Sequence, residues 1–356
     1  MIYFITPYPK GNAASQRFRF EQYFDLLTAR GLHYEVHPFW NEKGWEVLYL
    51  KGKTLQKSLH LIKGIFRRWL LAFQMKQSDF AFIHREIYPT GTGLLVWYLS
   101  KVKKVPIIYD FDDAIWLPNY AATNKRYAFL KSYHQVPKLI KNAYKVSVGN
   151  DFLKAYALKF NTNVCINPTT IDTKGHHNKI KSYEGQDQLV IGWTGTHSTI
   201  KYLDDLLAVF DQLTAEGKNI KLLVISDLHP NFDREYLQFV QWNKSTEIED
   251  LLQMDVGIMP LVDDQWSQGK CGFKALQYMS LGIPAIVSPV GVNLKIVKHG
   301  KNGWVCEKRN EWKAVLHEIL NDPAQLKGKS KAARSTIEQE YSVNSNSENF
   351  IRLFEI

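Results

Sequence analysis

Short hydrophobic runs alternate with stretches of helical periodicity along almost the whole chain. In the first half, strand-like apolar runs occupy residues 2–6, 34–39, 80–84, 106–111, 145–149 and 164–167. The stretches between them mostly repeat apolar residues with a helical period, as in residues 15–29. Regular alternation of strands and helices is typical of a parallel sheet with helices on both faces. The first half therefore predicts a doubly wound α/β domain.

The same rhythm lapses once and then restarts. Polar residues and glycine dominate residues 169–187, which indicates a linker. Beyond it, strands are expected at residues 189–193, 221–226, 256–261, 285–288 and 304–307. Helices are expected at residues 201–216, 246–253, from 272 onward, 311–320 and 323–341. The pattern predicts an α/β fold of two Rossmann-like domains, residues 1–168 and 188–341, that face a cleft.

Composition supports two domains and narrows the setting. A chain of 356 residues with 45% hydrophobic residues exceeds what one core usually supports. No apolar run is long enough to cross a bilayer, and the first residues lack the features of a signal peptide. The three cysteines are scattered, without metal-ligand spacing. We expect a cytoplasmic protein.

Positive charge is concentrated in the first half of the chain. Residues 1–184 contain 27 Lys and Arg against 13 Asp and Glu, a net +14, within a total of +10. Part of the excess lies at residues 51–73, where cations interleave with a helix-period apolar set. Such a helix favours an anionic membrane surface, which would make the protein peripheral on the inner face of the membrane. The alternative is an ordinary domain helix with a solvated basic face, and no motif supports nucleic-acid binding.

A glycine-bearing loop before the expected strand at 285–288 is suited to an anion. The first N–H groups of a helix have no partner within the helix and point outward with the positive end of its dipole. Gly269 and Gly272 remove side chains that would keep a ligand away from these groups. The loop therefore predicts a phosphate site at the start of the following helix.

Three polar residues of this region share one helix face. Lys270, Lys274 and Gln277 recur at i, i+4 and i+7. A helix terminus contributes roughly 0.3–1 kcal/mol toward an anion, whereas a hydrogen bond to a charged group contributes about 1.5–3 kcal/mol. A diphosphate would therefore need the lysines. The alternative is a solvated lysine face, and the absence of a Walker loop argues against a nucleotide triphosphatase.

Other candidates follow the carboxyl ends of the expected strands, where ligands of such sheets bind. The loop after the first strand carries Gly11, Arg17 and Arg19. The first loop of the second half carries Gly195 and Thr196, which are small enough to let a ligand approach the backbone.

The central strands of the first half end in titratable side chains. His84 ends one strand, and the next is followed by an acidic cluster, Asp110, Asp112 and Asp113. An Asp-x-Asp pair can hold a divalent metal, because hard cations prefer carboxylate oxygen. Acceptor binding, base chemistry and a salt-bridging cluster are alternatives. For His84, a packed structural role competes with a place in the cleft.

At these residues the chain resembles the GT-B glycosyltransferases, in particular glycosyltransferase family 4 and its bacterial cell-surface polysaccharide members. The resemblance is carried by the opening strand and its loop, the acidic cluster at Asp110, the segment 191–195 and above all the region 269–291. It implies sugar transfer from a nucleotide-diphosphate donor, held by the C-terminal domain, to a glycan or lipid-linked acceptor, held by the N-terminal domain. It also implies retention of configuration, no metal and no other cofactor, and a C-terminal helix within residues 342–356 that crosses back to the first domain.

Two departures from the family pattern affect the donor site. The family's paired glutamates fall on Gly269 and Gln277, and its phosphate-binding arginine falls on Trp193. Gln277 can still bind ribose hydroxyls through its amide. The sugar contact is then expected from backbone N–H groups of Cys271, Gly272 and Phe273, and the missing positive charge from the two lysines, which we assign as the catalytic residues.

Functions from other classes fit the same fold. A nucleotide-sugar epimerase would need no acceptor, and a non-catalytic two-domain sugar-binding protein would release no nucleotide.

The histidines at 176 and 177 lack partners at metal-ligand spacing, so no metal site is expected there.

Overall fold

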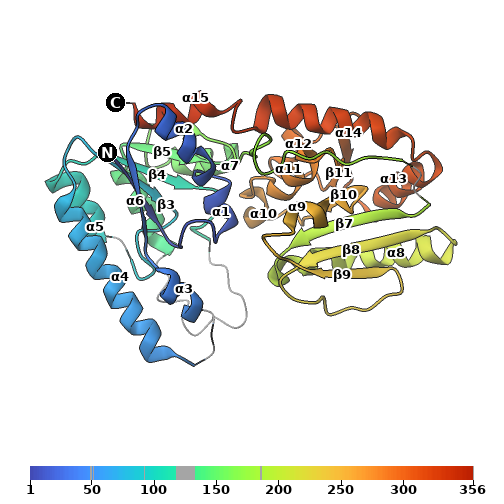
Figure 1. The fold of residues 1–356 in the computed structure, drawn as a ribbon, viewed down its shortest axis with the longest axis horizontal. Helices are drawn as coiled ribbons and strands as arrows, with labels where there is room; N and C mark the ends of the chain where they lie inside the picture. The colour runs from blue at the N-terminus through green and yellow to red at the C-terminus, as the bar shows by residue number, and fades with distance from the viewer. Residues whose placement is uncertain (49, 51, 92, 118–132, 185–186, 356) are drawn as a thin grey trace. The chain divides into compact units, whose positions relative to one another are not determined.

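The computed structural model divides the chain into two compact units (Figure 1). Unit 1 comprises Met1–Thr169 and Asn346–Ile356, and unit 2 comprises Thr170–Ser345. The structure describes residues 1–355 except 49, 51, 92, 118–132, 185 and 186. Lys51 of the basic segment and residues 185 and 186 of the expected linker thus lie outside the described residues.

Unit 1 is built on a six-stranded sheet of order β2-β1-β3-β4-β5-β6, in which every neighbouring pair is parallel. Its strands are β1 (Ile2–Thr6), β2 (Tyr34–Pro38), β3 (Phe80–His84), β4 (Ile107–Phe111), β5 (Lys145–Val148) and β6 (Val164–Ile166). All six strands expected from the sequence are confirmed, each to within one residue at its ends. The central strands are mostly apolar because both faces of a parallel sheet are covered, with Asp110 in β4 and Ser147 in β5 as buried polar exceptions.

The helical segments of unit 1 connect these parallel strands. They are α1 (Ala14–Arg17), η1 (Glu21–Tyr23), α2 (Phe24–Ala29), α3 (Glu42–Leu48), α4 (Thr54–Gln74), α5 (Gly93–Trp97), the π-helical η2 (Tyr98–Val102), η4 (Tyr133–Gln135), α6 (Val136–Asn142) and α7 (Asp151–Ala157). Aromatic rings fill much of the interior between sheet and helices. Phe4 of β1 lies 5.0 Å from Phe24 and 4.9 Å from Phe82, measured between ring centres.

Unit 2 repeats this plan with a sheet of order β12-β11-β10-β7-β8-β9, again wholly parallel. Its strands are β7 (Leu189–Gly195), β8 (Ile220–Ser226), β9 (Leu237–Gln241), β10 (Val256–Met259), β11 (Ala285–Val287) and β12 (Gly303–Val305). Its helical segments are η5 (His197–Leu203), α8 (Asp204–Ala215), α9 (Glu247–Leu252), α10 (Gln265–Gln268), α11 (Phe273–Ser280), α12 (Asn293–Ile296), α13 (Arg309–Asn321), α14 (Gln325–Thr336) and the π-helical η6 (Ile337–Tyr341). Two Rossmann-like parallel sheets confirm the predicted fold class, although β9 was not expected.

The segment expected as a linker is packed on unit 2. The Tyr183 hydroxyl donates a hydrogen bond to the backbone carbonyl of Asp255 at 2.8 Å, and Lys181 forms a 3.0 Å ion pair with the Asp255 side chain. Residues 170–184 therefore belong structurally to unit 2.

The chain ends on unit 1, in α15 (Ser347–Ile351) and η7 (Arg352–Phe354). The Phe350 ring stacks on Tyr23 with centres 4.2 Å apart, and Asn349 donates to the Ile166 carbonyl at 3.1 Å. Phe350 is fully buried, so these last residues complete the interior of the first unit.

Candidate functional site

The loop before α11 requires glycine at its last position. Gly272 is the residue before the helix and has a φ of 70°, in the left-handed region that side chains rarely adopt. A Cβ atom at Gly272 would also lie 2.2 Å from the Ile296 side chain. The helix that follows has eight residues, so its first amides are presented by a regular and well-formed end.

Tyr278 fixes α11 against the strands beneath it. Its hydroxyl accepts a hydrogen bond of 2.9 Å from the backbone N–H of Thr194, near the end of β7. Gly257 in β10 makes room for the Tyr278 ring, which a Cβ atom there would meet at 2.2 Å. The start of α11 is thereby held in place beside the carboxyl end of the sheet, where ligands of open α/β sheets bind.

Both lysines of the predicted phosphate site lie near aromatic rings of unit 2. The Lys274 Nζ atom is 5.2 Å from the centre of the Trp193 ring, and the Lys270 Nζ atom is 5.8 Å from that of Trp266. An ammonium over an aromatic face is held by the ring's quadrupole. Lys274 is thus directed toward β7, where Trp193 stands at the position of the family's arginine.

The remaining predicted donor residues of this loop lie around the helix start. Gly269 directly follows α10, Cys271 is 8% exposed, and Phe273 is the half-buried first residue of α11. Gly195 ends β7, and the exposed Thr196 hydroxyl is 2.9 Å from the Ser198 hydroxyl. These residues all belong to unit 2, and their contact with a donor stays a prediction.

Gln277 has a partner that the sequence did not reveal. Its amide is 2% exposed and donates a hydrogen bond to Glu247 of α9 at 3.4 Å. The same Glu247 oxygen accepts a hydrogen bond of 3.3 Å from the Trp242 indole, and His176 lies 3.2 Å from the other oxygen. A buried carboxylate is therefore present beside α11, although it comes from 30 residues earlier. Ribose binding by Gln277 stays a prediction.

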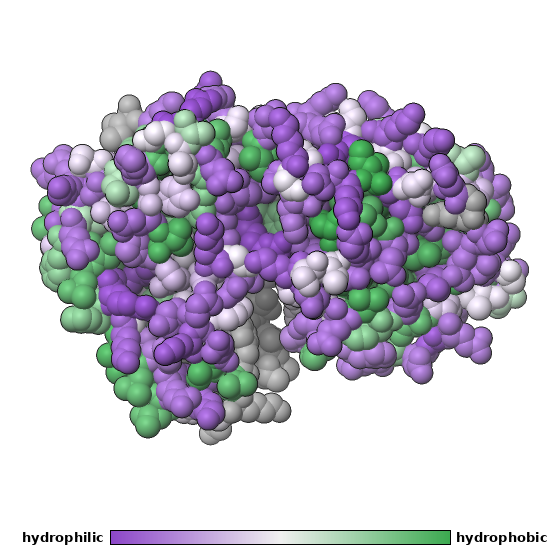
Figure 2. Space-filling view, viewed as in Figure 1, coloured by the Kyte–Doolittle hydropathy of each residue, from purple (hydrophilic) through white to green (hydrophobic). Residues whose placement is uncertain are grey.

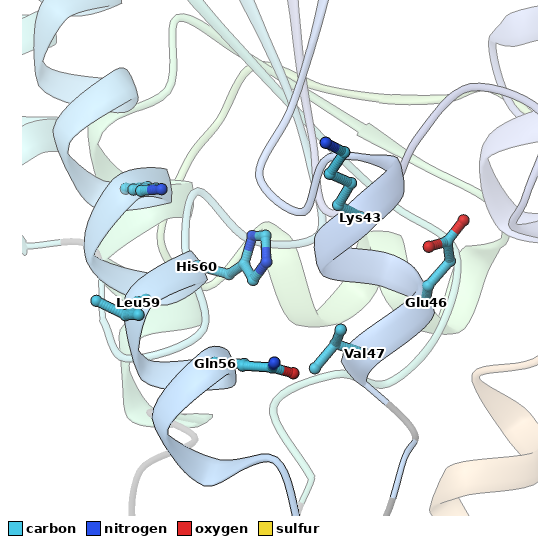
Figure 3. A pocket seen from close by; sticks show the side chains of 7 residues that line it. Lys43, Glu46, Val47, Gln56, Leu59 and His60 are labelled. Carbon is cyan, nitrogen blue, oxygen red and sulfur yellow. The ribbon is translucent and has the colours of Figure 1, made fainter.

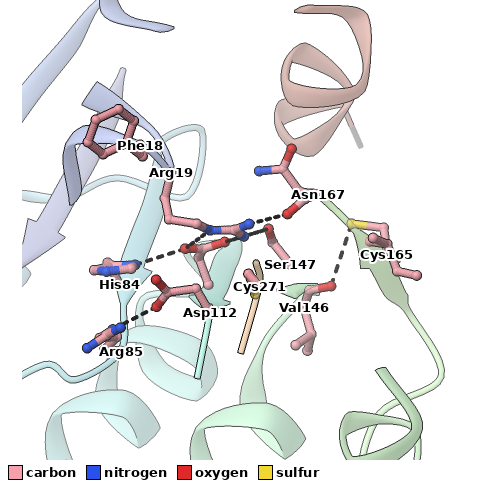
Figure 4. Close-up of polar contacts among 12 residues, drawn as sticks. Phe18, Arg19, His84, Arg85, Asp112, Val146, Ser147, Cys165, Asn167 and Cys271 are labelled. Atoms are coloured by element: carbon pink, nitrogen blue, oxygen red, sulfur yellow. Dashed lines mark hydrogen bonds and ion pairs between the residues drawn. The ribbon is translucent and has the colours of Figure 1, made fainter. Parts of the chain in front are cut away.

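In unit 1, Arg19, His84 and Asp110 form one buried network. Figure 4 shows the Arg19, His84 and Ser147 side chains directed toward one another. Asp110 accepts hydrogen bonds from the Arg19 guanidinium and from Ser147 at 2.7 Å, and lies 2.8 Å from His84 Nδ1. The register of β3, β4 and β5 explains this, because His84 is paired with Asp110 and Asp110 with Ser147.

The network is buried, and its internal contacts determine the charge of Asp110. Arg19, His84 and Asp110 are each at most 1% exposed. Burial alone would raise the pKa of Asp110, but the Arg19 guanidinium and the His84 hydrogen bond outweigh it and hold that pKa well below its usual range. Asp110 is thus an ionised carboxylate inside the unit. The Nε2 atom of His84 is buried without a hydrogen-bond partner among the described residues.

The other two carboxylates of the acidic cluster are paired with Arg85. Its guanidinium donates hydrogen bonds of 2.7 Å to Asp112 and to Asp113. Burial would raise the pKa of Asp112, but the Arg85 charge lowers it. These pairs agree with the salt-bridging alternative for the cluster. Among the described residues, no group of three or more His, Cys, Asp or Glu side chains is arranged to hold a metal ion.

Gly11 and Arg17 lie in the first loop of unit 1. Gly11 has a φ of 83°, and its N–H donates to the buried Glu21 carboxylate at 2.8 Å. Arg17 ends α1 and lies over the Phe18 ring, 4.9 Å from its centre. Contact of these residues with an acceptor stays a prediction, as it does for Arg19, His84 and the acidic cluster.

The basic segment forms α4, the longest helix of unit 1 among the described residues. One of its cations is not on the solvated face. Arg68 is 3% exposed and donates hydrogen bonds to the carbonyls of Thr6, His37 and Ile87. Burial lowers the pKa of Arg68 to about 9. In the part of the chain that the structure describes, no helix has both the length and the hydropathy needed to span a bilayer.

Comparison with known families identifies the second unit. Residues 188–322 match the family model described as Glycosyl transferases group 1. Over 169 residues, 44% of this chain, the sequence is 24% identical to the capsular polysaccharide biosynthesis glycosyltransferase CapM of Staphylococcus aureus. The match spans 43% of the length of that relative. The region that matches the family includes the whole lysine-bearing loop and α11.

Solved structures share the fold of the whole chain. Sucrose-phosphate synthase from Thermosynechococcus elongatus is 14% identical, with a TM-score of 0.70 over 99% of this chain and 98% of its own. HepE from Anabaena, solved in complex with UDP and glucose, is 14% identical, with a TM-score of 0.66 over 100% of this chain and 99% of its own. These findings agree with the resemblance seen in the sequence: residues 188–322 of the second unit match the group 1 glycosyl transferases, and the whole chain has the two-domain α/β fold of these solved structures.

Proposed function

We propose that the protein transfers a sugar from a nucleotide-diphosphate donor to a glycan or lipid-linked acceptor in cell-surface polysaccharide biosynthesis. The observation that supports this best is the start of α11, where Gly272, Lys270 and Lys274 lie inside the region that matches the family. The name of CapM supports the polysaccharide assignment, and the UDP and glucose bound by HepE support a nucleotide-sugar donor.

The donor diphosphate is proposed to bind at the first amides of α11. Backbone N–H groups there supply partial positive charge, and Lys270 and Lys274 add two full charges. During transfer the bond from the sugar to the diphosphate breaks, and negative charge develops on the leaving phosphate. The lysines stabilise that charge in the transition state, which is where stabilisation accelerates a reaction.

The acceptor is proposed to be held by unit 1. Its hydroxyl attacks the sugar carbon from the side of the leaving group, and its proton passes to the departing phosphate. This sequence retains configuration and uses neither a metal nor a protein nucleophile. The acidic cluster is compatible with this proposal, because each of its three carboxylates is already paired with an arginine. A lipid-linked acceptor would require a cytoplasmic protein to work at the inner face of the membrane.

The lysines provide the direct test. Lys270→Ala and Lys274→Ala should each lower kcat/KM by roughly one to two decades, about 1.4–2.7 kcal/mol of transition-state stabilisation. Lys327→Ala, which removes an exposed lysine from α14, is the matched control and should leave turnover unchanged. Sugar transfer from a panel of nucleotide sugars is the measurement. Near-normal turnover in both site variants would contradict the assignment.

Three simpler experiments test the base of the donor, the need for metal and the epimerase alternative. A nucleoside diphosphate that binds only the folded protein raises its stability, by about 2.7 kcal/mol at a hundredfold excess over Kd. Thermal shifts across nucleoside diphosphates therefore identify the base. Activity should persist in chelator, and conversion of a donor without any acceptor would instead indicate an epimerase.

A further inference from the structure

Helix α4 directs a continuous row of large hydrophobic side chains into solvent. These residues are 44% to 75% exposed and recur every three or four positions, so they share one helix face. They are Leu55, Leu59, Ile62, Phe66, Leu70 and Phe73.

The opposite face of the same helix forms the contact with the unit 1 sheet. Gly64 packs against Phe39, whose ring a Cβ atom at Gly64 would meet at 2.6 Å. Leu71 is 4% exposed, and Met75, directly after the helix, is 0% exposed. One face of α4 thus packs into the core of unit 1. The exposed row lies on a different face of the helix and is not part of that core.

A second segment extends the hydrophobic surface. Trp97 of α5 is 51% exposed, and Leu94 and Val102 on either side of it are 64% and 50% exposed. The two segments are joined by aromatic contacts, since Tyr98 lies 5.5 Å from Phe73 between ring centres. We call the exposed row of α4 together with Leu94, Trp97 and Val102 the apolar face. In Figure 2 hydrophobic residues gather along this edge of unit 1.

Positive charge predominates around the apolar face. From residue 47 to residue 78 the sequence contains no Asp or Glu, whereas α4 alone contains four Lys and Arg. Of these, Lys63 and Arg67 are exposed beside the hydrophobic row. Unit 1 as a whole has 25 Lys and Arg against 13 Asp and Glu, a net +12. A second copy of this face would bring like charges together, so the charge favours an anionic occupant.

A depression beside the row carries a further lysine. It lies between α3 and α4, has a volume of about 390 Å³, and its lining includes Lys43, Lys63, His60 and one carboxylate, Glu46 (Figure 3). Leu59 belongs both to its lining and to the hydrophobic row. Cations therefore lie next to apolar side chains, as the headgroup and acyl layers of a membrane require.

We propose that the apolar face docks on the surface of a bilayer rich in anionic phospholipid. α4 lies in the plane of the membrane, with its hydrophobic row in the acyl boundary and Lys43, Lys63 and Arg67 among the headgroup phosphates. Arg68 takes no part, because its guanidinium is buried and donates hydrogen bonds to three backbone carbonyls. The docking surface deepens the proposed function by bringing the enzyme to a lipid-linked acceptor, but binding itself needs neither donor nor acceptor.

Vesicle sedimentation tests the docking surface directly. The full-length protein is mixed with vesicles of phosphatidylcholine alone or with phosphatidylglycerol, and the bound fraction is measured. Ile62→Gln/Phe66→Gln shortens the hydrophobic row, and Lys63→Gln/Arg67→Gln removes two charges. Leu228→Gln/Leu294→Gln and Lys327→Gln/Lys331→Gln are matched controls, since these residues are equally exposed in unit 2. Circular dichroism confirms that each variant is folded.

The wild type should bind the anionic vesicles and leave the neutral ones largely unbound. Lys63→Gln/Arg67→Gln should lower the partition coefficient by about tenfold or more, because each cation near an anionic surface contributes about 1 kcal/mol. Ile62→Gln/Phe66→Gln should lower it by a similar factor, because binding also scales with the apolar area that the helix buries in the membrane. The unit 2 controls should bind like the wild type. Equal binding by wild type and Ile62→Gln/Phe66→Gln would overturn the proposal, as would a lipid-free dimer that this variant dissociates.

Transfer to a soluble acceptor separates this proposal from the proposed function. All four double variants should retain that activity, because none alters the donor loop. Vesicle binding by a protein without transferase activity would overturn the function but leave the docking surface intact. Transferase activity with no vesicle binding would overturn the docking surface but leave the proposed function intact.

Discussion

Arg19 and Asp110 show how strongly one buried ion pair depends on both partners. Their side chains are completely inaccessible to solvent. Asp110→Asn would leave the Arg19 charge buried and uncompensated, which typically costs about 3–5 kcal/mol. We expect a loss of this size in urea unfolding at neutral pH. Glu348→Gln, which breaks the exposed Arg30–Glu348 pair, is the control and should cost at most about 1 kcal/mol.

The same comparison has a defined pH dependence. A carboxylate whose pKa is lower in the folded than in the unfolded chain stabilises the fold above its unfolded pKa of about 4. That contribution is lost as the pH falls toward the folded pKa of Asp110, which is depressed. The stability difference between wild type and Asp110→Asn should therefore narrow as the pH falls from about 6 to 3. A constant difference would show that the carboxylate is not ionised in the fold.

The sequence indicated which titratable side chains are candidates, but it did not indicate which side chains contact one another. The strand ends drew attention to His84 and Asp110, because a polar residue near the end of an apolar run stands out, and the two side chains lie 2.8 Å apart in the structure. Nothing in the sequence indicated that Arg19 pairs with a carboxylate 91 positions away, or that Gln277 meets Glu247. Such contacts depend on strand register and helix packing, which hydrophobic periodicity does not encode.

The start of α11 depends on its glycine more than an ordinary turn does. Gly272→Ala should destabilise the protein and weaken nucleoside diphosphate binding, since the added methyl group meets Ile296 as well as an unfavourable φ. Gly217→Ala is the matched control, with a φ of 71° but open space around it. Its cost should be the left-handed strain alone, about 1–2 kcal/mol. Equal effects on urea unfolding and ligand titration would show that the Ile296 contact is unimportant.

At the level of elements, the predictable strands are those with continuous apolar runs. β9 was missed because its sequence, Leu-Gln-Phe-Val-Gln, mixes in glutamine and lies half-exposed at the edge of the sheet. The helix expected at residues 15–29 is divided into α1, η1 and α2. The break at Phe18–Phe20 contains the buried Arg19, whose ion pair with Asp110 is a tertiary contact that helix propensity does not predict.

Across the whole molecule, the two proposals predict two separate footprints. A nucleoside diphosphate should slow amide hydrogen exchange in peptides around residues 268–275 of unit 2. Anionic vesicles should slow it in peptides of α4, in unit 1. Exchange reports local opening, so protection follows the site of binding. Each ligand controls for the other, and protection of α4 by the nucleotide with none at the loop would contradict the donor assignment.

The sequence predicted the two α/β domains better than it predicted where one ends and the next begins. Repeated strand–helix alternation was enough to predict two parallel sheets. The packing of residues 170–184 on unit 2 was not foreseen, because their polar composition hides anchors such as Tyr183.

The return of the last helix to unit 1 has a consequence for biosynthesis. Translation proceeds at about 5–20 residues per second, and all of unit 2 is synthesised before Phe350 exists to cover Tyr23. The first unit to be synthesised is thus the last to be finished, and it waits many seconds with an aromatic gap in its interior. Nascent chains stalled before Asn346 should expose that gap to chaperones.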